Sequence, residues 1–214
     1  MNYRQQRNYE NLNRAIFPGV GQYDIPALQP VRSLQVDNWI GFNYVRGCEN
    51  PEEHGVHFFV DDYQFLRLWR DPDAYMQRLA QFQAVCTPDF STYTDFPLAV
   101  QIYNHYRKHW LGAYLAAHGA VVVPTISWSD EDSYTWCFDG EPRDSIVAVS
   151  SVGTQVDKTA QHLFFAGYRE MMERLQPRQI IMYGNIPDGC EGDIVQVSAF
   201  QQKWRTRPMQ EERV

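Results

Sequence analysis

The run AVVVPTI, residues 120–126, constrains the fold more than any other part of the sequence. An apolar run of this length that does not alternate with polar residues predicts a strand buried on both faces, as the central strands of parallel sheets are. It ends abruptly in the mostly polar and acidic segment SWSDED, residues 127–132. Ligands and catalytic groups lie at the carboxyl ends of strands in parallel α/β folds, so this boundary predicts the position of a functional site.

Four other apolar runs resemble this one and begin near residues 56, 84, 145 and 179. Apolar residues at helical spacing fill at least three of the four intervals, over about 63–82, 97–118 and 158–175. This alternation predicts an α/β fold of right-handed βα units with a mostly parallel sheet. The spacing does not decide between an open sheet and a small or incomplete barrel, and we favour the barrel-like arrangement.

The chain of 214 residues is predicted to form a single α/β domain over 36–200, with an N-terminal arm over 1–35 and a polar tail over 201–214. Its length and its hydrophobic content of 44% suit one sizeable core. The arm contains several prolines and glycines, so we expect little regular structure beyond one short helix near 9–16. Because Ile16, Phe17 and Ile25 are too apolar for a free tail, we expect the arm to wrap over the domain.

Charge and hydropathy argue against several classes of protein. No apolar run approaches the roughly 18 residues that span a bilayer, and the N-terminus lacks the apolar core of a secretory signal. We therefore expect a cytoplasmic protein with no membrane partner. The net charge of −7 repels nucleic acid on average, which argues against binding to duplex DNA but still allows a local basic patch.

Polar side chains follow each predicted strand and are expected to meet at one rim of the sheet. Asp62, Asp89 and Asp130 follow three different strands, and we predict that they act as catalytic groups and as metal ligands. Mg²⁺ or Mn²⁺ is the expected ion, since hard cations prefer carboxylate oxygens, and it would activate water or clamp a phosphate. The alternative is that these residues cap helices and loops. Further binding residues predicted on this rim are Asp61, Ser150 and Tyr183.

His105 and His109 lie four residues apart on a predicted helix, so they share a face and form a potential pair of metal ligands. The sequence contains no HExxH pattern and offers no third ligand near them. Apolar residues on the same helix mark an ordinary core-facing stripe, and we favour a structural role for the two histidines. The four cysteines lack the short spacing of a zinc site, although residues distant in sequence can still meet in space.

Several blocks of the sequence together resemble a known family. They are, in order, VHFFVDDYQFLRLWRDP, CTPDFSTYTDFPLAVQIYNHYRKHWLGAY, VVVPTISWSDEDSYTWCFDG, SIVAVSSVG and IIMYG. The chain is thereby similar, over roughly residues 39–184, to the domain of unknown function 4417, found in bacteria, their phages and other mobile elements. The resemblance implies this context and no mechanism, because the function of the family is not established. It also implies that Asn104 and Trp128 are binding residues that share a site with the predicted acids.

Two functional hypotheses follow. The first is a metal-dependent hydrolytic or nucleic-acid-processing enzyme of a mobile element, with its site at the strand ends. The second is a non-catalytic module that binds single-stranded nucleic acid or a protein partner through aromatic and basic side chains. The residues assigned to this second role are Tyr103, Trp128, Trp204, Arg205 and Arg207. A small-molecule pocket or a structural subunit of an assembly is a third alternative.

Overall fold

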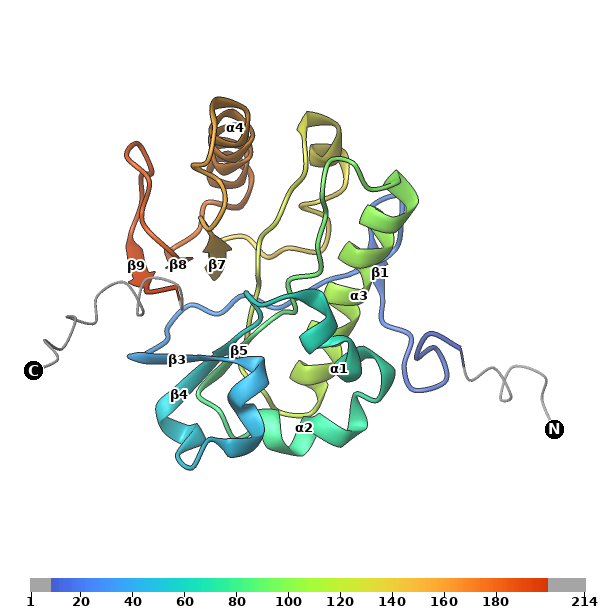
Figure 1. The fold of residues 1–214 in the computed structure, drawn as a ribbon. Helices are drawn as coiled ribbons and strands as arrows, with labels where there is room; N and C mark the ends of the chain where they lie inside the picture. Colours follow the sequence, from blue (N-terminus) through green and yellow to red (C-terminus); the bar gives the residue numbers. More distant parts are fainter. Residues whose placement is uncertain (1–8, 200–214) are drawn as a thin grey trace, which may run out of the picture.

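The computed structural model describes residues 9–199, which form an α/β fold in which strands and helices alternate (Figure 1). The strands are β1 (Gly19–Val20), β2 (Ile25–Pro26), β3 (Asn38–Gly41), β4 (His54–His57), β5 (Ala84–Cys86), β6 (Val122–Val123), β7 (Ile146–Ser150), β8 (Gln179–Tyr183) and β9 (Ile194–Val197). The α-helices are α1 (Leu66–Arg70), α2 (Asp73–Leu79), α3 (Leu98–Ala117) and α4 (Lys158–Leu175). Short 3₁₀ helices are η2 (Phe42–Gly47), η3 (Pro51–Glu53), η4 (Asp62–Gln64) and η5 (Glu131–Thr135).

The seven strands from β3 to β9 lie side by side in the order in which they occur along the chain. One parallel sheet has the order β3-β4-β5-β6, and a second has the order β7-β8-β9. A parallel bridge between Thr125 and Ala148 connects the two. This sequential order is that of a β/α barrel, and no pairing among the described residues joins β3 to β9. The predicted α/β fold with a mostly parallel sheet is therefore confirmed, and its strand order is that of an incomplete barrel.

Pro124 explains why the apolar run at 120–126 forms such a short strand. Proline has no N–H group to donate to a sheet, so β6 ends at Val123. The pairing then passes to the other neighbour, because the carbonyl of Pro124 accepts a hydrogen bond from Ala148 N at 2.8 Å, and Ile126 N donates to the carbonyl of Ala148 at 2.8 Å. The run is buried from Val122 to Ile126, as predicted, and it links the two sheets.

Strand β7 lies between two parts of the core. Ile146 and Ala148 belong to the cluster that packs with strands β4 to β6, whereas Val147 and Val149 pack against helix α4. This alternation follows from the two-residue period of a strand, and it requires apolar residues on both faces. Figure 1 shows α4 beside β7 and β8, on the side away from α1 and α2.

The helices begin and end close to the positions that the sequence predicts. The helical pattern at 63–82 divides into α1 and α2, with the interruption at Asp71 and Pro72. Helix α3 is followed at Gly119 by a left-handed backbone conformation, with φ of 89°. Helix α4 is capped by Asp157, whose carboxylate accepts a hydrogen bond from Ala160 N at 2.8 Å.

Residues 9–36 run across the domain beside α3 (Figure 1). Trp110 on α3 donates its indole N–H to the carbonyl of Ala15 at 3.0 Å, and Ile146 N in strand β7 donates to the carbonyl of Val31 at 2.7 Å. The short helix expected near 9–16 is instead a series of turns, followed by the β1-β2 pair. The tail, with Trp204, Arg205 and Arg207, lies outside the described residues, and the domain boundaries remain a prediction. Within residues 9–199, the helices are either too short or too polar to cross a membrane.

Candidate functional site

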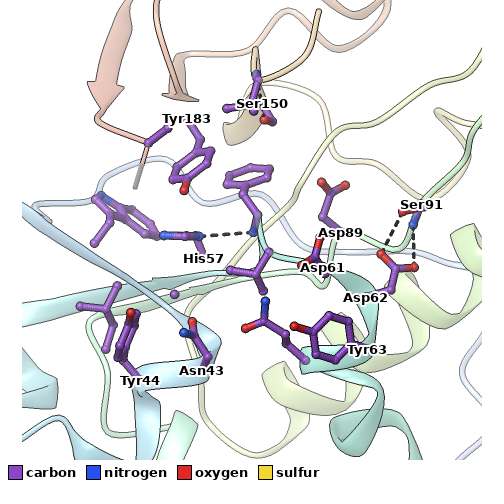
Figure 2. Close-up of a pocket in the computed structure, with 18 of the residues that line it drawn as sticks. Asn43, Tyr44, His57, Asp61, Asp62, Tyr63, Asp89, Ser91, Ser150 and Tyr183 are labelled. Atoms are coloured by element: carbon purple, nitrogen blue, oxygen red, sulfur yellow. Dashed lines mark hydrogen bonds between the residues drawn. The ribbon is translucent and has the colours of Figure 1, made fainter. Parts of the chain in front are cut away.

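A pocket of about 910 Å³ lies at the carboxyl ends of the parallel strands (Figure 2). Residues at or just after the ends of β3, β4, β5, β7, β8 and β9 contribute to its wall. This is the rim at which parallel β/α folds bind their ligands. The predicted residues that line this pocket, called the rim pocket below, are Asp61, Asp62, Asp89, Ser150 and Tyr183.

Asp62 is held in place by the loop that follows β5. Its two carboxylate oxygens accept hydrogen bonds from Ser91, one from the backbone N–H at 3.1 Å and one from the hydroxyl group at 2.9 Å (Figure 2). Asn104 on α3 fixes the same loop, because its side-chain amide donates to the carbonyl of Ser91 at 2.6 Å. Asn104 is thus a buried residue that supports the rim pocket and is not among the residues that line it.

Asp89 is the rim-pocket carboxyl group whose charge is most strongly affected by its surroundings. The pKa of Asp89 is raised to about 7, chiefly by burial, with an opposing effect of Lys108 and a smaller raising effect of the negative charge of Asp62. The side chain still lines the pocket and is only partly buried. At neutral pH this carboxyl group is therefore divided between its protonated and ionised forms, as a group that transfers protons must be.

His57 is a rim-pocket residue that the sequence analysis did not predict. It is the last residue of β4, and its Nδ1 accepts a hydrogen bond from Phe59 N at 3.3 Å. Its ring lies 4.6 Å from the ring of Tyr183, which stacks on Phe59 at 4.9 Å. A hydrogen bond from the backbone to Nδ1 leaves the proton of the neutral imidazole on Nε2. The position of His57 at the end of a strand, where the other rim residues also lie, was the available sequence signal.

Asp130 and Trp128 lie elsewhere. Asp130 lines a separate pocket of about 250 Å³ beside α4, together with Glu131, Asp132 and His162. Trp128 donates its indole N–H to the carbonyl of Leu163 on α4 at 3.1 Å and packs against helix α4. The structure thus brings Asp62 and Asp89 together in one pocket and places the third predicted acid in another.

The described residues of the rim pocket include no compact set of three metal ligands. Among residues 9–199, one group of histidine, cysteine, aspartate or glutamate side chains has its potential ligand atoms within 4.8 Å of one another. It consists of His105, His109 and Glu141, none of which lines the rim pocket. Mg²⁺, in contrast to Zn²⁺, commonly binds through one or two carboxylates and keeps water or substrate phosphate as its other ligands. Asp62 and Asp89, with the exposed Asp61 beside them, fit a site of this open kind.

Comparison with known proteins identifies the family of the chain. Two "Gene 1 protein" sequences are each 36% identical to the chain: that of Mycobacterium phage L5 over 206 residues, and that of Mycobacterium phage D29 over 209 residues. The alignments cover 95% and 96% of the chain and 90% and 77% of the two phage proteins. No solved structure matches the chain. Residues 17–201 match the family described as a domain of unknown function, DUF4417. The chain therefore belongs to the DUF4417 family, as the sequence blocks predicted.

Proposed function

We propose that the chain is a metal-dependent hydrolase that acts on phosphate esters in the rim pocket, with Asp62 and Asp89 as the groups that hold Mg²⁺ or Mn²⁺. The observation that carries this proposal is the raised pKa of Asp89 in a pocket that it shares with Asp62. Two carboxylates that repel each other in a partly desolvated site take up either a proton or a cation. A divalent cation relieves the repulsion and lets both groups ionise.

The charge of the rim pocket suits such a reaction only with a cation present. Asp61, Asp62 and Asp89 make the pocket acidic, so a bare phosphate group would be repelled. A cation held by the carboxylates binds the phosphate, polarises it and lowers the pKa of a bound water molecule.

The aromatic lining supports a nucleotide or a nucleic-acid end as the substrate. Aromatic side chains from several strands and loops line the same pocket as the carboxylates, among them Tyr44, Phe59, Tyr63 and Tyr183. Tyr44, Tyr63 and Tyr183 are labelled in Figure 2. Bases stack on such rings with little dependence on sequence. A pocket volume of about 910 Å³ is also in the range that holds a small-molecule ligand of this size.

Calorimetric titration with MgCl₂ and MnCl₂ tests the cation site. We expect the wild-type chain to bind one of the two ions more tightly at pH 8 than at pH 6, because the cation competes with the proton on Asp89. Asp89→Asn should lose most of this binding. Asp130→Asn is the matched control, since Asp130 lines the other pocket, and it should bind as the wild type does. Wild-type protein that binds neither ion at pH 8 contradicts the proposal.

The hydrolytic activity is tested separately. Simple phosphomonoesters and phosphodiesters, mononucleotides and labelled single-stranded oligonucleotides are incubated with the chain and either ion, and products are separated by mass. We expect turnover that requires the ion and falls at least about 100-fold in Asp89→Asn. Binding of the ion without turnover of any of these substrates would reject hydrolysis of phosphate esters and retain a cation site.

A non-catalytic site for single-stranded nucleic acid is the second candidate. Tyr63, Tyr93 and Tyr44, which line the rim pocket, are 73%, 62% and 53% exposed, so their rings are available for stacking. Binding of oligonucleotides that falls steeply with salt, without any cleavage, supports this candidate. A protein partner that co-purifies at high salt favours instead the protein-interaction role. Neither role depends on Trp128, which packs against α4.

A further inference from the structure

A second cluster of titratable side chains lies in the core and does not line the rim pocket. His105 and His109 on α3 meet Glu141, which belongs to the loop between η5 and β7, and all three are buried. Their potential ligand atoms lie within 4.8 Å of one another. We propose that His105, His109 and Glu141 form a binding site for a transition-metal ion of the Zn²⁺ type, which joins α3 to this loop and to the N-terminal arm.

In each imidazole, one of the two ring nitrogens is hydrogen-bonded to a backbone carbonyl oxygen. His109 Nδ1 lies 2.8 Å from the carbonyl oxygen of Pro26, and His105 Nε2 lies 3.0 Å from that of Asp139. A carbonyl oxygen only accepts, so each of these nitrogens carries a hydrogen atom. The neutral rings then keep their lone pairs on His109 Nε2 and His105 Nδ1. Metal-binding histidines are oriented in this way, with the second nitrogen donating to a carbonyl or carboxylate group.

The short contact between His109 and Glu141 requires a positive charge. This charge lies either on the imidazole ring or on a cation between the two side chains. His109 Nε2 lies 3.0 Å from Glu141 Oε1, and a lone pair on the nitrogen would repel the carboxylate at this distance. A second proton on the ring would relieve the repulsion, but Lys108 already donates to the same oxygen at 2.7 Å. An imidazolium would then stand beside an ammonium group in the core. A metal ion bound by Nε2 and the carboxylate removes the need for that proton.

A further observation favours a metal ion. Glu141 Oε2 is buried and has no hydrogen-bond partner, so one carboxylate oxygen is free to act as a ligand. Two imidazoles and one carboxylate are a common ligand set for zinc and related ions, with water or another donor as the fourth ligand.

Lys108 is the competitor of the metal ion. Its ammonium group donates to Glu141 and, at 2.9 Å, to the carbonyl of Thr125, and its side chain is only 2% exposed. A dication bound to Glu141 would repel this ammonium group. Removal of the charge with Lys108→Met should therefore strengthen metal binding. If the cluster is held together only by ion pairs and hydrogen bonds, this substitution should give no gain in metal affinity.

The test uses the full chain without a histidine tag. Because the cluster is buried, the protein is unfolded in denaturant with a chelator and refolded with or without one equivalent of Zn²⁺ or Co²⁺. Metal content is measured by mass spectrometry after gel filtration, and the Co²⁺ form is examined by visible absorption. We expect one ion per chain, a higher Tm for the Zn²⁺ form, and an absorption spectrum that indicates nitrogen and oxygen ligands.

Three variants connect the ion to the cluster. His105→Ala and Glu141→Gln should lower the affinity for Zn²⁺ by about 100-fold or more, and Lys108→Met should raise it. His118→Ala removes an exposed histidine near the end of the same helix and should bind as the wild type does. Wild-type protein that refolds with no bound ion and an unchanged Tm overturns the proposal, whatever the variants do. Equal loss of binding in His118→Ala and His105→Ala overturns it as well.

Discussion

The carboxylate of Asp62 accepts both hydrogen bonds that Ser91 can donate to it, at 3.1 and 2.9 Å. This contact joins η4, which follows β4, to the loop that follows β5. Side chains that lie far apart in the sequence, from Asp62 to Asn104, thus act on one another through a single loop. The charge of Asp89 depends on this arrangement, and the first two predictions test it.

Asp62→Asn should lower the pKa of Asp89 below its present value of about 7. The substitution removes the negative charge that disfavours ionisation of Asp89, but burial is the larger cause, so most of the rise above 3.8 should remain. NMR titration of the side-chain carboxyl carbon, with Asp89 labelled, measures the shift. Asp61→Asn is the control, because it removes an exposed charge from the same pocket. An equal shift in both variants would show that the effect of Asp62 is not specific.

Asp89 should also make the protein less stable as the pH rises from about 4 to about 7. Its pKa is about 7 in the folded chain, against 3.8 for an ordinary aspartate, so in this range the folded state holds a proton that the unfolded state has lost. Stability falls with pH wherever the folded state binds more protons. Relative to wild type, the free energy of unfolding of Asp89→Asn should therefore rise by about 3 to 4 kcal/mol between pH 4 and pH 8. Urea unfolding with a chelator present measures it, and a pH-independent difference contradicts it.

The strands and helices could be predicted because each depends on local pattern. The predicted strand at 179–183 is β8, and the predicted helix at 158–175 is α4. Position in space was harder to predict where the chain turns. The residues after Ile126 run along α4, which places Asp130 in the pocket beside that helix and not at the rim with Asp62. Periodicity contains no information about the direction of such a loop.

The partners of the two histidines illustrate the same limit. Spacing showed that His105 and His109 share a helix face, and the apolar stripe on the same helix favoured a structural role for them, with no third ligand near in sequence. The third group, Glu141, lies 32 positions after His109 and reaches it only through the packing of a loop on α3. The carbonyl group of Pro26 comes from the arm, on the other side in sequence. Contacts between three distant segments cannot be derived from the pattern of any one of them.

Removal of Lys108 should be strongly destabilising in metal-free protein. Lys108 and Glu141 form an ion pair with side-chain exposures of 2% and 0%, and a buried carboxylate that loses its partner is costly. We expect Lys108→Met to lower the free energy of unfolding by about 3 to 5 kcal/mol in the presence of a chelator. Arg32→Met is a matched control, because its ion pair with Asp144 is exposed and contributes about 1 kcal/mol or less. Equal effects of the two substitutions would contradict the importance of burial.

Trp128 and Gly167 allow a test of whether Trp128 is a binding residue or a packing residue. A Cβ atom at Gly167 would lie 2.2 Å from the indole Nε1 of Trp128, so Gly167→Ala must displace the ring and break its hydrogen bond to Leu163. We expect a loss of about 1 to 3 kcal/mol of stability from this overpacking. Gly47→Ala is the control, because a Cβ atom there meets no atom within 4 Å.

The same variants separate packing from binding. Displacement of Trp128 changes the surface beside α4, whereas the rim pocket is lined by other residues. Gly167→Ala should therefore leave the affinity for Mg²⁺ or oligonucleotides at the wild-type value below its Tm, even though its Tm is reduced. Thermal unfolding and calorimetric titration on one preparation measure the two quantities. If Gly167→Ala keeps its stability but loses affinity, Trp128 is a binding residue, as the family resemblance implies.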